Sequence, residues 1–185
     1  ALMDNIDHVT EHIRNKKPGK VALHFHHTAD RKTYVIDGDN FWRMTNYVKS
    51  VTYNSVKDPA ILCNAGKAFG EFQMDLADFD SSRLYETIPN FHNTPSRVAD
   101  FDKALAADVM GRAESAKAEI EFVQSHRAMA SKLLDLMAKG EIPERITHND
   151  TKINNVMLDD ESGEGICVID LDTIMPGISL YDFGD

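Results

Sequence analysis

The stretch ITHNDTKINNVMLDDESGEGICVIDLDT, residues 146–173, carries the strongest evidence about the fold and function of this chain. Its short apolar runs predict buried strands, and six polar residues stand between those runs: His148, Asp150, Lys152, Asn155, Asp170 and Asp172. A buried polar group costs free energy unless it is paired, and an isolated buried charge costs far more. The segment therefore needs either a dense network of ion pairs or a bound ligand.

Composition limits the class of protein. A chain of 185 residues suffices for one domain, or for a small lobe joined to a larger one. The net charge of −10 argues against a nucleic-acid partner, because a phosphate backbone attracts a basic surface. No apolar run approaches the roughly 18 residues that span a bilayer, and residues 1–19 lack the apolar core of a signal peptide. We therefore expect no membrane partner.

The cysteines and the clustered histidines do not form a recognisable metal site. Cys63 and Cys167 stand far apart and neither belongs to a CxxC pair, so we expect two buried, reduced thiols in a cytoplasmic protein. His24 and His26 lie on one face of a predicted strand and could bind a metal. No cysteine or carboxylate follows at ligand spacing, which favours an exposed sheet face instead.

The first half of the chain predicts one helix followed by strands. Apolar residues recur at helical spacing over residues 4–15, and a Pro-Gly pair then ends the pattern. Residues 20–29 and 32–38 alternate as strands do, with a turn at 29–31 between them. Residues 40–48 predict a third strand, or a strand that runs into a linker.

The second half is predicted to be largely helical before it reaches the polar segment. Helices are expected over 61–76, from 94 to 105, and as one long helix over 113–139 whose apolar residues face a core. Residues 86–97 contain two prolines and predict a loop. A helix, three strands, a connector, long helices and a final strand-rich segment indicate an α+β fold with two lobes.

The spacing His148-x-Asp150-x₄-Asn155 matches the catalytic loop of protein kinases, where the aspartate accepts the substrate hydroxyl proton and the asparagine holds magnesium. Asp170 follows at the end of a predicted strand, where a second oxygen ligand for Mg²⁺ belongs. Lys152 could counter charge on a transferring phosphoryl group. An ordinary turn with Asp and Asn bonded to their own backbone is the alternative. Three elements in order between two strands favour the site.

Three further carboxylates near this segment have less certain roles. YDFGD, residues 181–185, contains the Asp-Phe-Gly of the kinase magnesium motif, but it lies far beyond the expected base. We therefore interpret Asp182 and Asp185 as structural or substrate-side carboxylates. Asp172 either joins the coordination shell of the metal or hydrogen-bonds amides of its own loop.

The segment resembles the aminoglycoside phosphotransferase and choline kinase superfamily, which is related to protein kinases. THNDTKINNV and VIDLDTIMPG, with ETIPNFHNTPSR and YDFGD, are most similar to the bacterial N-acetylhexosamine 1-kinases. The resemblance implies a protein-kinase-like two-lobed fold. Residues 1–48 would form part of the small lobe and the hinge, and residues 49–185 the catalytic, mostly helical large lobe.

The resemblance also implies an activity, which is ATP-dependent transfer of a phosphoryl group to a hydroxyl of a small molecule, first of all an N-acetylhexosamine. Asp150 would be the base and His148 would support the catalytic loop. Mg²⁺ would be held by Asn155 and Asp170, and the adenine of ATP would lie near the hinge, at Tyr47 and Val48. Three alternatives stay open: an aminoglycoside or choline kinase, a noncatalytic pseudokinase or binding fragment, and a metal-dependent hydrolase, which would leave Lys152 and Asn155 without roles.

Two departures from the family pattern shape our expectations. Such kinases begin with a glycine-rich loop and a strand lysine that contact the phosphates. Neither precedes Gly19, the first glycine. Glu11 could be the partner of that lysine, or it lies on a solvated helix face. We expect an internal fragment that does not turn over by itself and whose uncovered sheet edge promotes self-association.

Overall fold

A computed structural model describes all 185 residues and divides them into two compact units. Unit 1 comprises Ala1–Thr87 and Glu144–Asp185, and unit 2 comprises Ile88–Pro143. The units do not coincide with a division after residue 48, so the expected lobes stay a prediction. None of the helices combines the length and the apolar composition that crossing a membrane requires.

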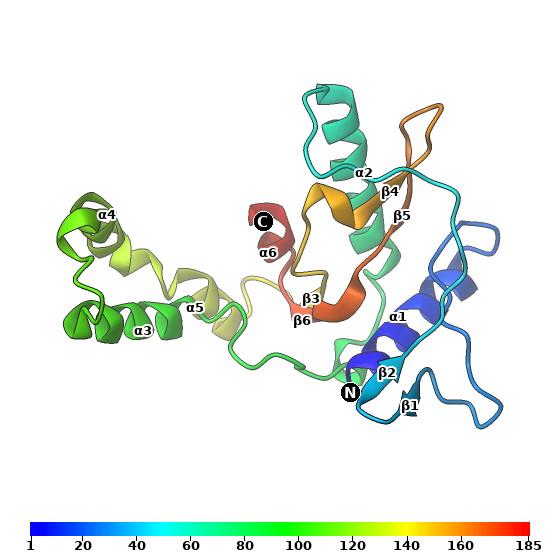
Figure 1. The fold of residues 1–185 in the computed structure, drawn as a ribbon, viewed down its shortest axis with the longest axis horizontal. Helices are drawn as coiled ribbons and strands as arrows, with labels where there is room; N and C mark the ends of the chain where they lie inside the picture. Colours follow the sequence, from blue (N-terminus) through cyan, green and yellow to red (C-terminus); the bar gives the residue numbers. More distant parts are fainter. The chain divides into compact units, whose positions relative to one another are not determined.

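The chain consists of helices and short strands (Figure 1). In chain order the elements are α1 (Leu2–Lys16), β1 (Val35–Asp37), β2 (Asn40–Trp42), α2 (Pro59–Asp75), α3 (Thr94–Ala107), α4 (Lys117–His126), α5 (Lys132–Ala138), β3 (Arg145–Thr147), β4 (Val156–Leu158), β5 (Gly165–Val168), β6 (Met175–Gly177) and α6 (Ser179–Gly184).

α1 forms as its apolar spacing predicts. Met3, Ile6, Val9 and Ile13 recur every three or four residues and are all buried. They belong to the main core of unit 1, together with apolar side chains of α2, β3, β5 and the turn after β5. Burial of this face, more than helix propensity, stabilises the helix.

α2 begins at a well-formed cap. The Asp58 carboxylate accepts a hydrogen bond from the Ala60 amide at 2.9 Å, and a proline follows it at the first helical position. Phe72 is buried as predicted, whereas Leu62 is half exposed. A Cβ on Gly165 would lie only 2.7 Å from the Cβ of Ala68, so the glycine allows β5 to approach the helix closely.

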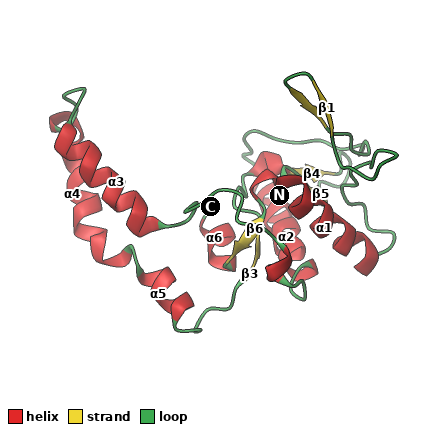
Figure 2. Ribbon diagram, turned by 90° about the horizontal axis from the view of Figure 1, so that it is seen from below, coloured by secondary structure: helices red, strands yellow, loops and turns green.

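Four strands of unit 1 form two nested antiparallel pairs. β4 pairs with β5 through the register Val156↔Val168, and β3 pairs with β6 through Thr147↔Met175. Figure 2 shows β3 beside β6, next to α6. Because the outer pair encloses the inner one in sequence, the loop from β3 to β4 and the loop from β5 to β6 meet. Residues 148–155 and 169–174 therefore share one end of the strands.

The predicted strands over residues 20–38 form only in part. Burial does alternate, since Leu23 and Phe25 are buried and His26 is exposed, but residues 20–29 form no regular strand and make only the isolated bridge Phe25↔Thr45. The predicted turn is present, with the Thr28 amide donating to the Lys32 carbonyl at 2.8 Å. The regular hairpin that forms is β1–β2. The alternation of apolar and polar residues predicts which side of a strand is buried, but it does not predict which other strand pairs with it.

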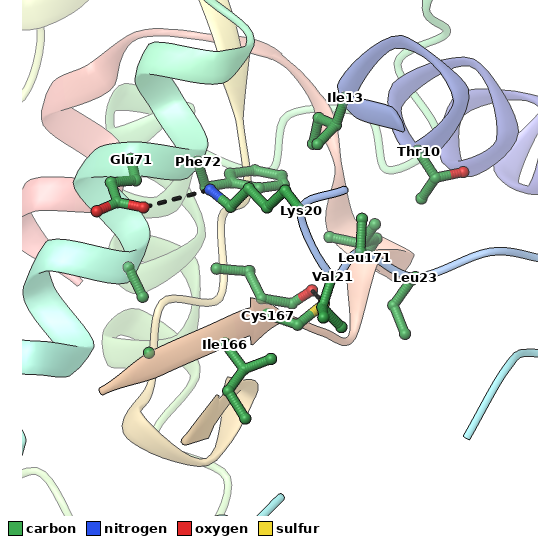
Figure 3. A pocket seen from close by; sticks show the side chains of 14 residues that line it. Thr10, Ile13, Lys20, Val21, Leu23, Glu71, Phe72, Ile166, Cys167 and Leu171 are labelled. Atoms are coloured by element: carbon green, nitrogen blue, oxygen red, sulfur yellow. Dashed lines mark hydrogen bonds and ion pairs between the residues drawn. The ribbon is translucent and has the colours of Figure 1, made fainter. Parts of the chain in front are cut away.

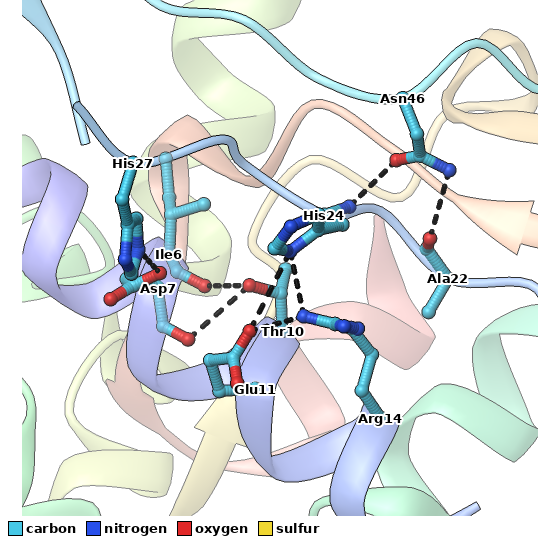
Figure 4. Close-up of polar contacts among 9 residues, drawn as sticks. All are labelled: Ile6, Asp7, Thr10, Glu11, Arg14, Ala22, His24, His27 and Asn46. Carbon is cyan, nitrogen blue, oxygen red and sulfur yellow. Dashed lines mark hydrogen bonds and ion pairs between the residues drawn. The ribbon is translucent and has the colours of Figure 1, made fainter. Parts of the chain in front are cut away.

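The neighbouring histidines contact α1 (Figure 4). His24 Nδ1 lies 2.6 Å from Arg14 Nη1, and His27 Nε2 lies 2.8 Å from Asp7 Oδ1. Burial, followed by the nearby Arg14 charge, lowers the pKa of His24. Glu11 pairs with Arg14 on the partly exposed face of the helix. These contacts join residues 24–27 to α1, and they involve Glu11 through its pairing with Arg14.

The prediction of a single long helix over residues 113–139 is wrong. The segment instead contains α4, a 3₁₀ turn at Arg127–Met129 and α5, and none of its side chains is fully buried. At the break, Ser125 Oγ donates to the Phe122 carbonyl at 2.8 Å, and His126 Nδ1 lies 2.8 Å from the same oxygen. Side chains that bind a helix carbonyl compete with the next turn of backbone bonds. Because the side chains of this segment are not fully buried, apolar packing does not compensate for the helical bonds lost at the break.

The two cysteines differ in their surroundings. Cys63 is exposed on α2, contrary to expectation, and Cys167 is buried in β5 as predicted. Cys167 lines a pocket between α1, α2 and β5, across which Lys20 reaches Glu71 (Figure 3). Burial raises the pKa of the Cys167 thiol to about 11. The thiol therefore stays protonated and unreactive at neutral pH.

Asp75 is the only acidic residue that the fold buries, with 2% of its side chain exposed. Lys20 Nζ donates to it at 2.9 Å and Lys17 pairs with its second oxygen. Burial raises the pKa of the Asp75 carboxyl, but the bonds from Lys17 and Lys20 lower it by more, so the pKa lies below its ordinary value. The ionised carboxylate consequently ties the C-terminal ends of α1 and α2 together.

We expect Asp75→Asn to lower the free energy of unfolding at pH 7 by about 2 kcal/mol, because charge-assisted hydrogen bonds are lost. The folded-state pKa is depressed, so the contribution is present above the unfolded carboxyl pKa and fades as the pH falls through the folded value. Urea titrations at pH 7 and pH 3 test this, with the exposed Asp100→Asn as control. A difference from wild type that stays the same at both pH values would contradict the role of the charge.

Candidate functional site

The candidate site lies where the two loops of the nested strand pairs meet. The Ile169 amide donates to the Asn155 carbonyl at 2.9 Å, directly beyond the pair Val156↔Val168. Asn155 therefore enters β4 at the point where Asp170 leaves β5. The backbone pairing alone brings together two residues that the sequence separates by fifteen positions.

His148 connects the two loops from the interior. Its ring is fully buried, with the edges of Phe69 and Phe72 packed against it. Nε2 lies 2.8 Å from the Ile169 carbonyl, and Nδ1 accepts from the Asp150 amide at 3.3 Å. A neutral ring protonated on Nε2 satisfies both contacts. His148 thus shapes the loop around Asp150 and does not itself reach a ligand in solvent.

Asp182 caps the start of the same loop. One carboxylate oxygen accepts from the His148 amide at 3.0 Å and from Gln73 Nε2 at 2.8 Å, and the other accepts from the Asn149 amide at 2.8 Å. Of the two roles that we expected for Asp182, structural or substrate-side, these contacts favour the structural one. The second expected carboxylate, that of Asp185, accepts from the Thr151 amide.

Asn149 is a structural residue that the sequence reasoning missed. It adopts a left-handed conformation with φ 67°, which Asn tolerates better than most residues. Its Nδ2 donates to the Thr173 carbonyl at 2.8 Å, and Thr173 Oγ1 donates to the His148 carbonyl at 2.6 Å. These bonds lock the two loops together. The signal available in the sequence was that an asparagine, which tolerates this conformation, directly precedes the expected base.

Asp150 lies at the edge of the site, with 30% of its side chain exposed. Lys152 Nζ is 2.6 Å from its Oδ2, and Asn155 Nδ2 donates to the same oxygen at 3.0 Å and to the Asp150 carbonyl at 2.8 Å. Burial raises the pKa of Asp150, but the bonds from Lys152 and Asn155 lower it by more, so it lies below the ordinary value. Asp150 is therefore an ionised carboxylate, able to accept a proton.

The carboxylates around Lys152 raise its pKa, whereas the pKa of Asp150 is lowered. Its bond to Asp150 raises its pKa, and the charges of Asp170 and Asp185 act in the same direction. Its side chain is half exposed. The ammonium group is thus firmly cationic and borders the carboxylates from both loops.

Asn155 and Asp170 fit a hard cation. Asn155 is buried and its amide nitrogen is engaged by Asp150, so its side-chain oxygen is the atom able to coordinate. Asp170 is exposed, forms no ion pair or side-chain hydrogen bond, and has a left-handed backbone with φ 60°. One amide oxygen and one carboxylate leave room for the waters and phosphates with which Mg²⁺ completes its shell. The chain has no cluster of three His, Cys, Asp or Glu side chains able to hold a metal.

Three other residues lie outside this constellation. Asp172 is neither bonded to loop amides nor free, because Arg43 Nη1 lies 2.7 Å from its Oδ1. Tyr47 is 89% exposed, and Val48 is buried. The placement of these last two near an adenine stays a prediction.

Comparisons with known proteins identify a family and a similar fold. A family model described as the phosphotransferase enzyme family, APH, matches residues 3–185. A solved structure of the gentamicin-APH(2")-IIa complex resembles the chain with a TM-score of 0.50 at 16% sequence identity, covering 98% of this chain and 57% of that one. At this identity the likeness concerns the fold alone, and it confirms the expected α+β, kinase-like architecture. This chain belongs to the phosphotransferase enzyme family.

Proposed function

We propose that the protein is a small-molecule kinase that transfers the γ-phosphoryl group of ATP to a hydroxyl with the help of Mg²⁺. The observation that carries the proposal is the ionised Asp150, hydrogen-bonded to Lys152 and Asn155, beside the unpaired carboxylate of Asp170. Membership in the phosphotransferase family supports the same reaction class. The chain spans 57% of its structural neighbour, so this activity is proposed for the whole protein.

In the proposed reaction the acceptor oxygen attacks the γ-phosphorus as the bond to the ADP oxygen breaks, and Asp150 takes the hydroxyl proton. Mg²⁺ held by Asn155 and Asp170 would neutralise charge on the phosphates. Lys152 has two possible partners, Asp150 and the phosphates. A move of its ammonium group to the phosphates would stabilise them and raise the basicity of Asp150 when the proton is transferred.

For the acceptor we propose an N-acetylhexosamine or a related sugar, on the strength of the THNDTKINNV and VIDLDTIMPG motifs. An aminoglycoside or a choline-type alcohol is the alternative class. A coupled ADP-release assay with N-acetylhexosamines, galactose, choline and aminoglycosides distinguishes these acceptors. It is run on residues 1–185 and on the complete product of the gene.

A noncatalytic, kinase-like binding protein is the second candidate. The favouring observation is that Glu11 is already paired with Arg14, with His24 Nδ1 3.6 Å from the same carboxylate oxygen, and so is not free for a phosphate-binding lysine. ATP binding without ADP release, for every acceptor in the assay, would support this candidate. For cellular location we propose the cytoplasm, because both cysteines are unpaired thiols.

We expect Asp150→Asn to reduce turnover by about 10²–10⁴-fold while nucleotide affinity changes little, because the amide cannot accept the proton. ADP release measures the first quantity and calorimetry the second. Asp160→Asn, an exposed aspartate in the turn between β4 and β5, is the matched control. Near-normal turnover of the Asp150 variant would refute the assignment of the base.

We expect Asp170→Ala to abolish Mg²⁺-dependent nucleotide binding at a cost in stability of only about 1 kcal/mol, which comes from placing alanine at φ 60°. Asp182→Ala is the contrast, since it removes the acceptor of two loop amides and should lower the melting temperature. Calorimetry with MgATP, alongside thermal melts, separates the two effects. A well-folded Asp182 variant with equal loss of magnesium would overturn our choice of carboxylate.

We also propose that the chain self-associates through the β1–β2 hairpin. The two three-residue strands leave four large apolar side chains exposed: Val35, Ile36, Phe41 and Trp42. Exposed apolar edges favour pairing with a second copy. Ile36→Asp should shift sedimentation velocity profiles towards the monomer, whereas Val109→Asp in unit 2 should not. Equal profiles for wild type and the Ile36 variant would exclude this surface.

A further inference from the structure

Arg43 lies where three parts of unit 1 meet. Its Nη1 is 2.7 Å from Asp172 Oδ1 in the loop after β5. The guanidinium lies 5.5 Å from the centroid of the Phe25 ring, and the same Nη1 is 3.6 Å from the sulfur of Met3 in α1. Both members of the ion pair are partly buried, with 35% and 44% of their side chains exposed. Arg43 thus joins the segment after β2 to the loop that carries Asp170.

That loop needs support from its surroundings. Asp170 has φ 60° and ψ 56°, a conformation that costs a non-glycine residue roughly 1 kcal/mol and persists only where neighbouring contacts impose it. Leu171 is buried in the main core. The Thr173 carbonyl is held by Asn149, and the Ile174 carbonyl accepts from Asn5 at 3.0 Å.

Asp172 is the remaining residue of this loop, and its carboxylate pairs with Arg43. Every residue of the loop from 171 to 174 is therefore held by another element, whereas the Asp170 side chain makes no bond. A carboxylate whose backbone is held in place while its oxygens stay unpaired is preorganised for a cation. The two aspartates of the Asp-Leu-Asp sequence consequently differ, since one is free for a ligand and the other is bound by the protein.

We propose that Arg43 is a positioning residue, which acts through Asp172 to present the Asp170 carboxylate to a divalent cation. The proposal rests on the metal role of Asp170 in the proposed function. Arg43 touches neither Asp150 nor Asp170, so it acts on the geometry of the loop and takes no part in the chemistry. The flat guanidinium both reaches the carboxylate and lies near the Phe25 ring, which a lysine ammonium cannot reproduce equally well.

A purely structural role predicts a different result. An ion pair between partly exposed groups contributes less than about 1 kcal/mol to stability. Residues that orient a metal ligand, in contrast, change metal affinity by roughly 10–100-fold when replaced. Metal affinity and loop order therefore distinguish the two roles, while thermal stability serves as the control.

The test uses Arg43→Gln, Asp172→Asn and the double variant of residues 1–185. Hydrogen exchange is followed at the amides of Ile169 and Ile174, which donate to the Asn155 and Leu171 carbonyls at 2.9 and 3.1 Å. Mn²⁺ binding is measured by electron paramagnetic resonance, without nucleotide or turnover. Arg83→Gln is the matched control, because Arg83 likewise lies over an aromatic ring, 5.1 Å from the Phe79 centroid, but in another part of unit 1.

We expect each single variant to accelerate exchange at both amides and to weaken Mn²⁺ binding about tenfold. The double variant should be no worse than either single one, because both changes remove the same contact. Arg83→Gln should match wild type.

Unchanged exchange and unchanged Mn²⁺ affinity in Arg43→Gln would overturn the proposal. So would a loss of Mn²⁺ binding in Asp172→Asn alone, because Asp172 would then be a ligand in its own right. If wild type binds no Mn²⁺, the metal site of the proposed function fails, and with it the metal-presenting role of Arg43. The exchange data would then still decide whether Arg43 holds the loop.

Discussion

The enclosure of the β4–β5 hairpin by the β3–β6 pair is the constraint on which the rest of the structure depends. It brings residues 148–155 and 169–174 to one end of the strands. Side chains at that end then bond the backbone carbonyls of the other loop, since His148 Nε2 lies 2.8 Å from the Ile169 carbonyl and Thr173 Oγ1 donates to the His148 carbonyl. The Asp170 carboxylate takes no part in these bonds and stays exposed.

α1 completes this arrangement from the other side of the core. Asn5 is almost fully buried, and its amide group bonds both backbone groups of Tyr85 as well as the Ile174 carbonyl. A buried amide with its bonding capacity satisfied specifies one geometry at little cost, whereas an unsatisfied one would destabilise the core. Apolar burial thus holds α1 in place, and one polar side chain sets its register against the loop.

The sequence was most informative where one local pattern determined the outcome. Apolar spacing predicted α1 and α2, and the His-x-Asp-x₄-Asn spacing placed Asp150 and Asn155 side by side, with Asp170 brought in by strand pairing. The expected adenine contacts and metal ligation stay predictions.

It was least informative where the outcome depends on distant partners. The Arg43–Asp172 pair joins positions 129 residues apart, the long helix breaks where Ser125 and His126 compete for a carbonyl, and residues 20–29 lack a regular strand to pair with. None of these three features produces a periodic pattern in the sequence.

The cap that Asp182 places on residues 148 and 149 also bears on how this part of the chain folds. The amides of His148 and Asn149 find their acceptor 34 and 33 residues further along the chain. Until α6 docks, these amides lack their native partner and the turn that carries Asp150 has little reason to hold its left-handed residue. The native turn around Asp150 therefore depends on α6 as well as on the hydrophobic core. A nascent chain that has already formed α1, α2 and both strand pairs, but not α6, would still lack the acceptor for these two amides.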